Sequence, residues 1–415
     1  MSNDTQPEIR FPGFTEDWEQ CKLLDNVAQV LDYRGKSPTK FGMEWGTEGY
    51  LVLSALNVKN GYIDKSVEAK YGNQELFERW MGLNRLKKGD VLLTTEAPLG
   101  NVAQVPDDSG YILNQRTVAF KTSENTDNNF FAQLLRSPIV QNTLIANSSG
   151  GTAKGIGMKE FAKLRANVPS KIEEQKKIGQ FFKQLDDTIA LHQRKLDLLK
   201  ETKKGFLQKM FPKNGAKVPE IRFPGFTEDW EQRKLINYTK LITKGTTPKD
   251  KTGSGKVNFV KVENLSDGKI LPIQKITEEE HEGYLKRSRL EEGDILFSIA
   301  GTLGRTAIVN KSILPANTNQ ALAIIRSYDF DKYFLVTTLT GHVVAEYIRK
   351  NPTVGAQPNL SLEQVGQLII NTPIKGEQKK IGNFFKQLDD TITLHQRKLD
   401  LLKEMKKGFL QKMFV

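Results

Sequence analysis

The clearest pattern of apolar and polar positions lies in residues 174–211, where apolar side chains recur at steps of four and three. These positions are Ile178, Phe182, Leu185, Ile189, Leu196, Leu199, Phe206 and Met210. His192 and Lys203 occupy the two remaining steps, so the alternation is unbroken. The segment has no proline and is rich in Leu, Lys, Gln and Glu, which predicts one long helix with a coiled-coil seam. If it is helical throughout, it would be roughly 57 Å long at 1.5 Å per residue.

Residues 377–414 repeat this segment with three changes, at Gln180/Asn383, Ala190/Thr393 and Thr202/Met405. The seam positions of this second copy include Ile381, Phe385, Leu388, Ile392, His395, Leu399 and Leu402. Two near-identical copies separated by unrelated sequence are hard to explain as single core helices, so we expect them to form an antiparallel pair. If they cross near their midpoints, His192 approaches His395, where a polar residue more often fixes register than does chemistry.

The apolar surface of each helix is wider than a two-stranded coiled coil requires. Besides the seam, apolar side chains occur at Phe181, Leu191, Leu198 and Leu207, and in the second copy at Leu394, Leu401 and Leu410. We expect helices of a partner protein to cover this surface and complete a bundle. The alternative is that the chain's own domains cover it.

A shorter repeat opens each half of the chain. Residues 7–23, PEIRFPGFTEDWEQCKL, and residues 219–235 differ only at Cys21 and Arg233. The prolines and glycine of this repeat favour an extended strap. The chain therefore divides into an N-terminal strap 1–23, a domain 24–173, a long helix 174–211, a linker with the repeated strap 212–235, a second domain 236–376 and a second long helix 377–415.

The two domains between these repeats have diverged but share a skeleton. The matching segments are Asn57–Ile63 with Asn264–Ile270, Leu86–Leu92 with Leu290–Leu296, and Asn114-Gln115 with Asn319-Gln320. Short apolar runs, cut by Gly-Asp, Asn-Gly and Pro, predict strands and turns, and residues 128–147 and 330–350 predict short helices. Each domain is therefore expected to be α+β, with mixed, mainly antiparallel strands.

The chain carries 61 Lys and Arg against 49 Asp and Glu, a formal net charge of +12. Most of the excess lies in the long helices and the linker, so nucleic-acid contact by the domains would depend on local patches. The N-terminus is polar and unlike a secretory signal, no apolar run reaches the length of a membrane span, and Cys21 is the single cysteine. These features predict a cytoplasmic protein that does not enter a membrane.

Catalytic motifs are missing from the sequence. The glycine-rich segments 148–157 and 251–257 lack the spacing of a phosphate-binding loop. No Asp/Asn-Pro-Pro-aromatic motif for amino-methyl transfer occurs, and His281 and His342 have no partner pattern. Asp90, Glu96 and Asp294 could suggest a metal-dependent nuclease, but Gly-Asp closes a turn there and no lysine follows at a fitting interval. We therefore expect neither a catalytic site nor a metal site.

The whole chain resembles the specificity subunits of type I restriction–modification systems. The resemblance rests on the IRFPGF opener, the Gly-Asp-Ile-Leu strand, the helix that runs from EQKKI to KKGFLQKMF, and the order of segments. It implies that each variable domain recognises one half of a bipartite, asymmetric DNA site. It further implies that the two helices set the spacing of the half-sites and dock two methyltransferase subunits, which use S-adenosylmethionine to modify adenine N6. A restriction subunit would add ATP- and Mg-dependent translocation and cleavage, while this chain would need no cofactor and perform no catalysis.

Contacts to double-stranded DNA cannot be transferred from the family, because its recognition domains vary, so our candidates come from chemistry and position. Candidates for base edges, or for loops near them, are Gln115, Arg116, Thr152, Lys154, Gln320, Gln357 and Asn359. Candidates for phosphates are Arg34, Lys36, Lys244 and Lys249, in matching early loops. It is equally consistent with the sequence that Asn114, Asn319 and their neighbours only cap turns.

Directly repeated halves favour a pseudo-two-fold molecule that imitates a dimer on DNA. Two other functions are compatible with the same sequence. The chain could be a DNA-binding regulator or architectural protein that acts without an enzyme, or a coiled-coil scaffold whose globular ends bind proteins. A stable complex with a methyltransferase would separate the first function from these two.

Overall fold

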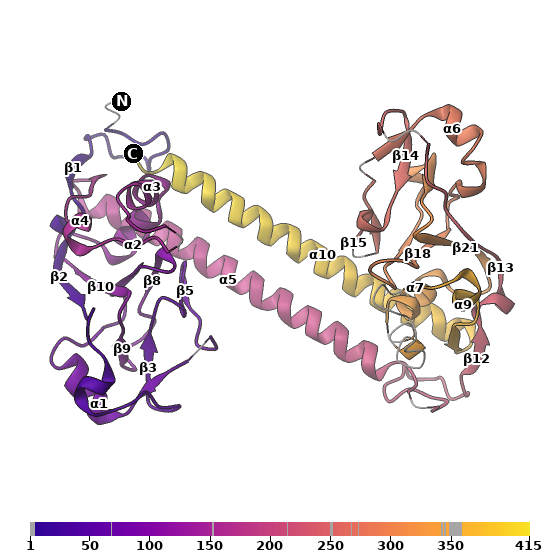
Figure 1. Cartoon of the computed structure of the whole chain (residues 1–415), viewed down its shortest axis with the longest axis horizontal. Helices are drawn as coiled ribbons and strands as arrows, with labels where there is room; N and C mark the ends of the chain where they lie inside the picture. Colours follow the sequence, from indigo (N-terminus) through magenta and orange to yellow (C-terminus); the bar gives the residue numbers. More distant parts are fainter. Residues whose placement is uncertain are drawn as a thin grey trace. The chain divides into compact units, whose positions relative to one another are not determined.

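The computed structural model describes residues 5–415 except 68, 152, 214, 250, 251, 267, 273, 342, 344, 345 and 348–358. The chain forms two compact units. Unit 1 comprises Met1–Gln193 and Lys398–Val415, and unit 2 comprises Arg194–Arg397. Each unit therefore contains one variable domain, the first part of one long helix and the last part of the other (Figure 1).

The predicted long helices are α5 (Ile172–Lys209) and α10 (Lys375–Lys412), each of 38 residues. Both begin two residues before the EQKKI sequence and end before the Met-Phe pair that closes each copy. Acidic residues occupy the first turn of each helix and a lysine the last turn, which complements the helix dipole. None of the helices in the described ranges has the length and apolar content needed to cross a lipid bilayer.

Unit 1 holds a four-stranded antiparallel sheet in the order β2-β10-β7-β8 and a three-stranded sheet in the order β6-β3-β9, in which β3 and β9 are parallel. Its strands are β1 (Glu19–Lys22), β2 (Val27–Asp32), β3 (Tyr50–Leu53), β4 (Val58–Lys59), β5 (Tyr62–Ile63), β6 (Tyr71–Gly72), β7 (Val91–Thr95), β8 (Leu99–Gln104), β9 (Tyr111–Leu113), β10 (Thr117–Thr122) and β11 (Arg165–Val168). Its helices are α1 (Gln74–Met81), α2 (Asn128–Arg136), α3 (Pro138–Ala146) and α4 (Met158–Phe161), with 3-10 turns at Leu23–Asn26 and Pro38–Phe41.

Unit 2 repeats both sheets, with the orders β13-β21-β18-β19 and β17-β14-β20, and β14 is again parallel to β20. Its strands are β12 (Glu231–Lys234), β13 (Thr239–Lys244), β14 (Val257–Val260), β15 (Leu265–Ser266), β16 (Lys269–Ile270), β17 (Gln274–Ile276), β18 (Ile295–Ser298), β19 (Thr306–Ile308), β20 (Ala316–Thr318), β21 (Leu322–Tyr328) and β22 (Ile369–Thr372). Its helices are α6 (Glu278–Glu282), α7 (Lys332–Thr340) and α9 (Leu362–Gly366), with 3-10 turns at Leu235–Tyr238, Val262–Asn264, Lys286–Ser288 and Lys311–Ile313. The predicted α+β fold with mainly antiparallel strands is confirmed in both units.

The segment 128–147, predicted as helical, forms two helices. Ser137 separates α2 from α3, and Pro138 is the first residue of α3. The residue before a proline is driven out of the helical region, whereas proline itself suits a first helical position. Ser137 is accordingly extended and its hydroxyl accepts a hydrogen bond from the Val140 N–H. The second predicted segment, 330–350, is helical as α7, and most of its later residues lie outside the described part of the chain.

Each strap is tied to the start of a long helix by a buried ion pair. Arg10 donates two hydrogen bonds to Glu174, at 2.7 and 2.8 Å, and Arg222 donates two to Glu377 at the same distances. Glu174 and Glu377 are 1% and 0% exposed. These hydrogen bonds, which the carboxylates accept, are the main cause that raises the pKa of each arginine.

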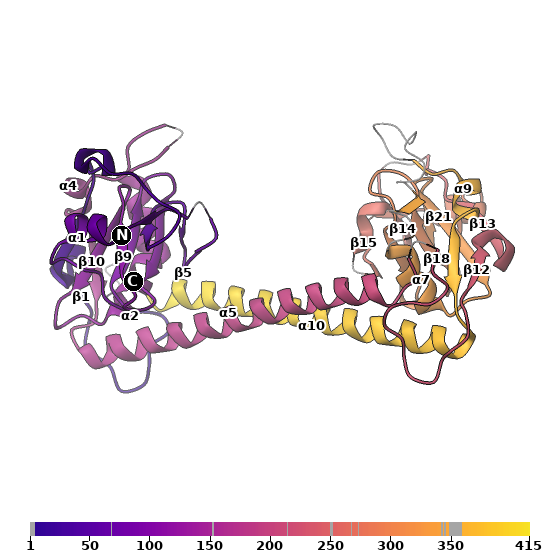
Figure 2. The ribbon, with the colours of Figure 1, turned by 90° about the horizontal axis from the view of Figure 1, so that it is seen from below.

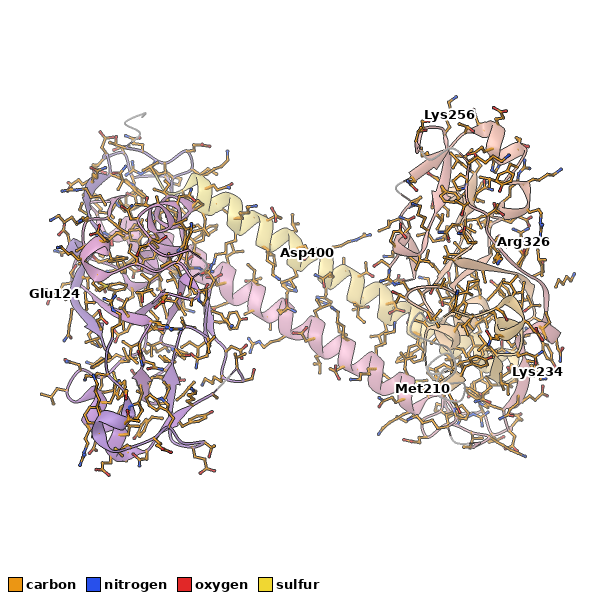
Figure 3. The ribbon with its side chains drawn as sticks, in the orientation of Figure 1. Glu124, Met210, Lys234, Lys256, Arg326 and Asp400 are labelled. Carbon is orange, nitrogen blue, oxygen red and sulfur yellow. The ribbon has the colours of Figure 1, made fainter. Side chains whose placement is uncertain are left out.

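The strap also closes the end of the other long helix in its unit. In unit 1 the Ile9 N–H donates to the Lys412 carbonyl, and in unit 2 the Ile221 N–H donates to the Lys209 carbonyl. Trp18 and Trp230 are buried behind these contacts, where Trp18 meets Phe414 edge to face. Figure 3 labels Met210, which follows α5 and is buried in the core of unit 2. The two openers therefore hold helix ends together.

The sequence EQKKIG docks the variable domain of unit 1 onto α5. Gln175 accepts a hydrogen bond from the backbone N–H of Asp127, the N-cap of α2, and donates to the Pro169 carbonyl. Gly179 lies directly beneath the first turn of α2. A Cβ at Gly179 would stand 2.6 Å from the Phe130 nitrogen. Figures 1 and 2 show α2 beside this part of α5.

Unit 2 uses the same three contacts. Gln378 accepts a hydrogen bond from the backbone N–H of Asp331, the N-cap of α7, and donates to the Pro373 carbonyl. A Cβ at Gly382 would likewise stand 2.6 Å from the Phe334 nitrogen. Two domains of different sequence therefore sit on their helices in the same way.

The two long helices are antiparallel within each unit. In unit 1 Phe181 meets Phe409 and Asp186 binds Lys406, and in unit 2 Phe384 meets Phe206 and Asp389 binds Lys203. Of the seam residues, Ile178, Phe182, Leu196, Met210, Ile381, Phe385 and Leu399 are buried. The others are half-buried: Leu185, Ile189, His192, Leu199, Lys203, Phe206, Leu388, Ile392, His395 and Leu402. His192 and His395 belong to different units, so their approach stays a prediction.

We expect Gly179→Ala to lower the free energy of unfolding by about 3 kcal/mol, because the new methyl group meets backbone atoms that cannot move without undocking α2. Gly205 lies in the same helix with nothing within 4 Å of a Cβ. Gly205→Ala should therefore raise stability by about 1 kcal/mol, the difference in helix propensity. Urea unfolding of the full chain tests both changes, and equal effects of the two variants would contradict the docking contact.

Lys406 predicts a pH dependence of stability. Burial and the charge of Arg136 lower the pKa of Lys406 from 10.5 to about 8, although Asp186 opposes this shift. Between these pH values the unfolded chain holds a proton that the folded chain has released, so stability rises with pH from about 8 to 10.5. Over this window wild type should gain about 3 kcal/mol relative to Lys406→Met. Urea unfolding at several pH values measures the gain, with exposed Lys183→Met as the control. A difference in the free energy of unfolding between wild type and Lys406→Met that stays the same at every pH would refute the prediction.

Candidate nucleic-acid interface

The residues predicted for base contact follow the paired parallel strands. In unit 1, β3 and β9 end side by side at Leu53 and Leu113, and the Asn114 N–H donates to the Leu53 carbonyl at 2.9 Å. In unit 2, β14 and β20 end at Val260 and Thr318. Because the carboxyl ends of parallel strands meet at one edge, Gln115 and Gln320 each lie beside the turn that follows the first strand of the pair. Both glutamines are exposed.

The turns themselves share an asparagine framework. Asn57 accepts a hydrogen bond from the Ser54 N–H, and Asn264 accepts one from the Lys261 N–H, both at 2.8 Å. Both asparagines are buried. Asn114 likewise accepts from the Gln115 N–H, so these asparagines do cap turns, as the alternative held. The asparagines cap the turns, and the glutamine side chains are exposed beside them.

Three segments converge on this edge in unit 1. The Thr95 N–H donates to the Arg116 carbonyl, and the Ile156 N–H donates to the Thr95 carbonyl. Glu96 forms a β-bridge with Gly155 of the glycine-rich loop and an ion pair with the Arg116 side chain at 3.5 Å. Arg116 and the exposed Lys154 are thereby brought to one side of the domain. Thr152 lies outside the described residues.

The same convergence occurs in unit 2. The Ile299 N–H donates to the Ala321 carbonyl, the Leu360 N–H donates to the Ile299 carbonyl, and Ala300 forms a β-bridge with Asn359. Gln320 and Asn359 therefore lie in one region of the domain. Gln357 lies outside the described residues.

The early loops contribute unequally. Arg34 is exposed and forms an ion pair with Asp32, which raises the pKa of the arginine; burial of Asp32 opposes its ionisation, but Arg34 outweighs this and lowers the pKa of the carboxyl. Lys36 turns inward instead. Its ammonium donates to the Trp80 carbonyl at 3.1 Å and lies over the Tyr33 ring, and burial lowers its pKa.

In unit 2 the early loop after β13 contacts the edge at which β14 and β20 end. Thr247 donates to the Gln320 side chain, which places the loop after β13 beside β20. Lys244 ends β13 and is exposed. The ammonium of Lys249 lies 4.5 Å from the centre of the exposed Tyr284 ring. Lys244 and Lys249 therefore remain suited to phosphate contact.

Each edge is hollowed into a groove with an excess of cations. The groove in unit 1 has a volume of about 240 Å³, and its polar and charged side chains include Lys70, Gln115 and Arg116. The groove in unit 2 has a volume of about 440 Å³ and holds Lys261 and Lys275 with one carboxylate, Glu263. Such grooves suit the edges and phosphates of a nucleic acid.

Several groove residues were not predicted from the sequence, namely Ser54, Leu56, Lys70, Lys261, Glu263 and Lys275. The shared asparagines at 57 and 264 did mark the two turns. Residues 54–56 and 261–263 within those turns were passed over because they differ between the domains. The signal that could have identified them is that they differ between the domains although they lie in turns marked by a shared asparagine.

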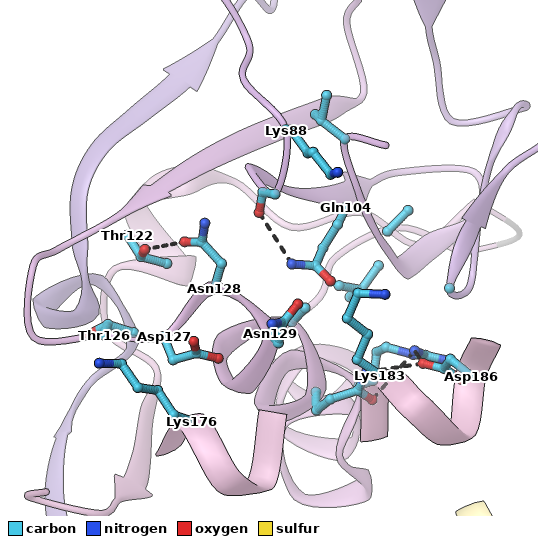
Figure 4. Close-up of a pocket in the computed structure, with 18 of the residues that line it drawn as sticks. Lys88, Gln104, Thr122, Thr126, Asp127, Asn128, Asn129, Lys176, Lys183 and Asp186 are labelled. Carbon is cyan, nitrogen blue, oxygen red and sulfur yellow. Dashed lines mark hydrogen bonds and ion pairs between the residues drawn. The ribbon is translucent and has the colours of Figure 1, made fainter. Parts of the chain in front are cut away.

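A larger hollow of about 870 Å³ lies between the variable domain of unit 1 and α5 (Figure 4). Lys88 lines it from the domain, and Lys176 and Lys183 line it from α5. Four cationic and four acidic side chains line this hollow, so it has no net charge to attract a polyanion. The two grooves are therefore better candidates for a nucleic-acid interface than this hollow.

The carboxylates that could suggest a nuclease have structural partners. Asp90 accepts from the Lys87 N–H and binds Lys121, while Asp294 accepts from the Glu291 N–H and binds Arg326. Glu96 pairs with Arg116. Across the described ranges, no group of three or more His, Cys, Asp or Glu side chains is placed to hold a metal ion. These carboxylates stabilise turns.

The long helices present a second surface. Their outer ends are covered by the chain's own domains, since Phe181, Leu207 and Leu410 pack against the cores of their units. Four leucines nearer the middle are not covered. Leu191 and Leu401 in unit 1 are 59% and 60% exposed, and Leu198 and Leu394 in unit 2 are 68% and 66% exposed. The chain's own domains therefore cover the outer parts of the wide apolar face, and the covering of the middle leucines by partner helices stays a prediction.

Known proteins resemble this chain over two thirds of its length or more. The type I restriction enzyme MjaVIII specificity subunit of Methanocaldococcus jannaschii is 23% identical over 413 residues, which cover 95% of this chain and 91% of that protein. The EcoBI specificity subunit of Escherichia coli is 25% identical over 301 residues, 67% of this chain and 62% of that protein.

Solved structures show the same fold. The S subunit of the type I restriction–modification system from M. genitalium aligns with 99% of both chains, with a TM-score of 0.66 and 15% identity. A chain from a structure on complex assembly and conformational transition of the type I R-M system aligns with 97% of both chains, with a TM-score of 0.51 and 18% identity.

A family model described as the type I restriction modification DNA specificity domain matches this chain twice, over residues 15–201 and 227–404. Each match begins in a strap and ends in a long helix, so it coincides with one structural repeat. With a specificity domain matched in each half, the chain belongs to the type I restriction–modification specificity subunits, which direct the enzymes of such a system and are not themselves the enzyme.

Proposed function

We propose that each groove reads one half of a bipartite DNA site in double-stranded DNA. The observation that carries this proposal is that the two grooves share one backbone framework but present different side chains. Both grooves place a glutamine after β9 or β20, beside a turn capped by a buried asparagine. A glutamine can bind the N6 and N7 atoms of adenine, and arginine or lysine can bind guanine or phosphate. Because the other groove residues differ, the two half-sites differ and the whole site is asymmetric.

We propose that the exposed leucines dock methyltransferase subunits, one on each unit. Leu191 lies five residues after Asp186 and Leu401 five residues before Lys406, so the antiparallel register places these two leucines at one level of the helix pair. Leu198 and Leu394 have the same relation in unit 2. Apolar helices of a partner would remove them from water as a bundle does. A DNA-binding protein that acts alone would gain nothing from this surface.

In this proposal the chemistry belongs to the partners. The methyltransferase subunits would bind S-adenosylmethionine, and a restriction subunit would bind ATP and Mg, while this chain needs no cofactor. Helices of roughly 57 Å would act as a rigid spacer that fixes the distance between the two half-sites. In dimeric DNA readers this distance is one duplex turn. The complex would act on DNA in the cytoplasm.

Deletion of this gene should remove one bipartite methylated-adenine motif from the genome, because no other groove pair would direct the methyltransferase to that site. Sequencing that detects modified bases in cells with and without the gene measures this. Exchange of residues 24–173 for another such domain should change only one half of the motif. An unchanged methylation pattern after deletion would refute the proposed function.

Substitution of Leu191 and Leu401 by Glu should prevent co-purification of the methyltransferase subunit of unit 1. The free energy of unfolding should change by less than about 0.5 kcal/mol, because these side chains are exposed in the free chain. Leu83 is fully exposed on the domain of unit 1, so Leu83→Glu is a matched control that should bind normally. Measurement of the stoichiometry of the purified complexes decides the result, and full binding by the double variant would place the docking surface elsewhere.

A further inference from the structure

The turns at 54–57 and 261–264 end in the same asparagine and differ at the three residues before it, of which the first and third line the groove in both units. Asn57 and Asn264 hold both turns with the same 2.8 Å hydrogen bond. Ser54 and Leu56 line the groove of unit 1, and Lys261 and Glu263, at the equivalent positions, line that of unit 2. A fixed backbone with exchangeable groove residues is the arrangement expected of a specificity determinant.

We infer that residues 56 and 263 each select a base by its major-groove substituent. Leu56 would contact the 5-methyl group of a thymine in the first half-site. Glu263 would accept a hydrogen bond from the exocyclic amino group of a base in the second half-site. The inference rests on the proposed function, and it adds which chemical group each domain requires.

Leu56 lacks the packing that would explain an apolar residue at this position. It is 44% exposed and is not part of the hydrophobic clusters of unit 1, although Leu53 and Val58 on either side are fully buried. The Leu56 N–H donates to the Ser54 hydroxyl, which holds the turn. Around Leu56 the groove presents Lys70, Gln115 and Arg116. In the major groove, thymine differs from the other bases because it presents a methyl group beside polar groups. An apolar side chain among polar ones is suited to contact that methyl group.

Glu263 has the opposite character. Its side chain is 66% exposed, and its carboxylate lies 3.9 Å from the Lys261 ammonium, at the outer limit for an ion pair. A carboxylate that approaches DNA is repelled by phosphate unless a base offers it a donor. Glutamate therefore favours an amino group and rejects a carbonyl oxygen at the same place.

The test for Leu56 uses deoxyuridine, which lacks only the 5-methyl group of thymidine. The complete complex of this chain with its methyltransferase is titrated with its own DNA site. Each thymine of the first half-site is replaced singly by uracil, the first half being the one that changes when residues 24–173 are exchanged. One replacement should weaken binding of the wild-type complex by about fourfold, the value of one buried methyl group. A complex with Leu56→Ala should bind the two DNAs equally, and one with Leu83→Ala should behave as wild type.

The test for Glu263 uses the second half-site. One cytosine or adenine there should bind at least tenfold better than thymine at the same position in wild type, as expected for a base-specific hydrogen bond. Glu263→Gln should reduce this preference, because an amide can also donate to a carbonyl oxygen. Circular dichroism of each variant checks that the fold is retained.

The outcomes separate the inference from the proposed function. Sequence-specific binding with no methyl-sensitive thymine in the first half-site, or with equal sensitivity in Leu56→Ala, overturns the assignment of Leu56. An unchanged base preference in Glu263→Gln overturns that of Glu263. Binding without any sequence preference overturns the proposed function, and both assignments with it.

Discussion

The contact on which the rest of the structure depends is the docking of a short helix onto a glycine of each long helix. At Gly179 and Gly382 the backbone of α2 or α7 comes so close that no side chain fits between them. Gln175 and Gln378 tie the same helix N-terminus to the chain before the long helix. Each groove is thereby held at a fixed place along a rigid helix, since a domain that slid would lose these backbone contacts together. The position of each domain along its long helix is set by backbone contacts, which do not depend on the groove residues.

This separation explains how the two domains can differ without misfolding. The buried asparagines that cap the turns are common to both grooves, as are the parallel strand pairs. Leu56, Gln115, Glu263 and Gln320 are exposed, and substitutions at such positions usually change stability by less than about 0.5 kcal/mol. Recognition residues can therefore vary at little cost to stability, whereas the EQKKIG contacts cannot.

The sequence predicted what depends on local periodicity and internal comparison. The long helices follow from steps of three and four, and Asn114-Gln115 was found because a second copy existed for alignment. Long-range pairing was not predictable. Strands β3 and β9 are far apart in the chain, and the groove forms where these two strands pair in parallel. Lys36 was expected to face phosphate, but Trp80 of α1 offers it a carbonyl and a ring, a partner that no local pattern reveals. Leu56 was missed because it differs from Glu263 at the equivalent position, so the comparison of the two domains did not mark it.

The exposed leucines complete this division of roles. Single exposed leucines are ordinary on protein surfaces. Here, however, they recur at equivalent positions of two helices, while the same helices bury Phe182 and Phe385 completely. The domains cover the helix ends through contacts that are the same in both units, and the uncovered leucines lie beyond their reach. One partner with one apolar surface could then bind both units, whatever the grooves contain. The near-identity of the helices is what such a partner requires, and the divergence of the grooves is what an asymmetric DNA site requires.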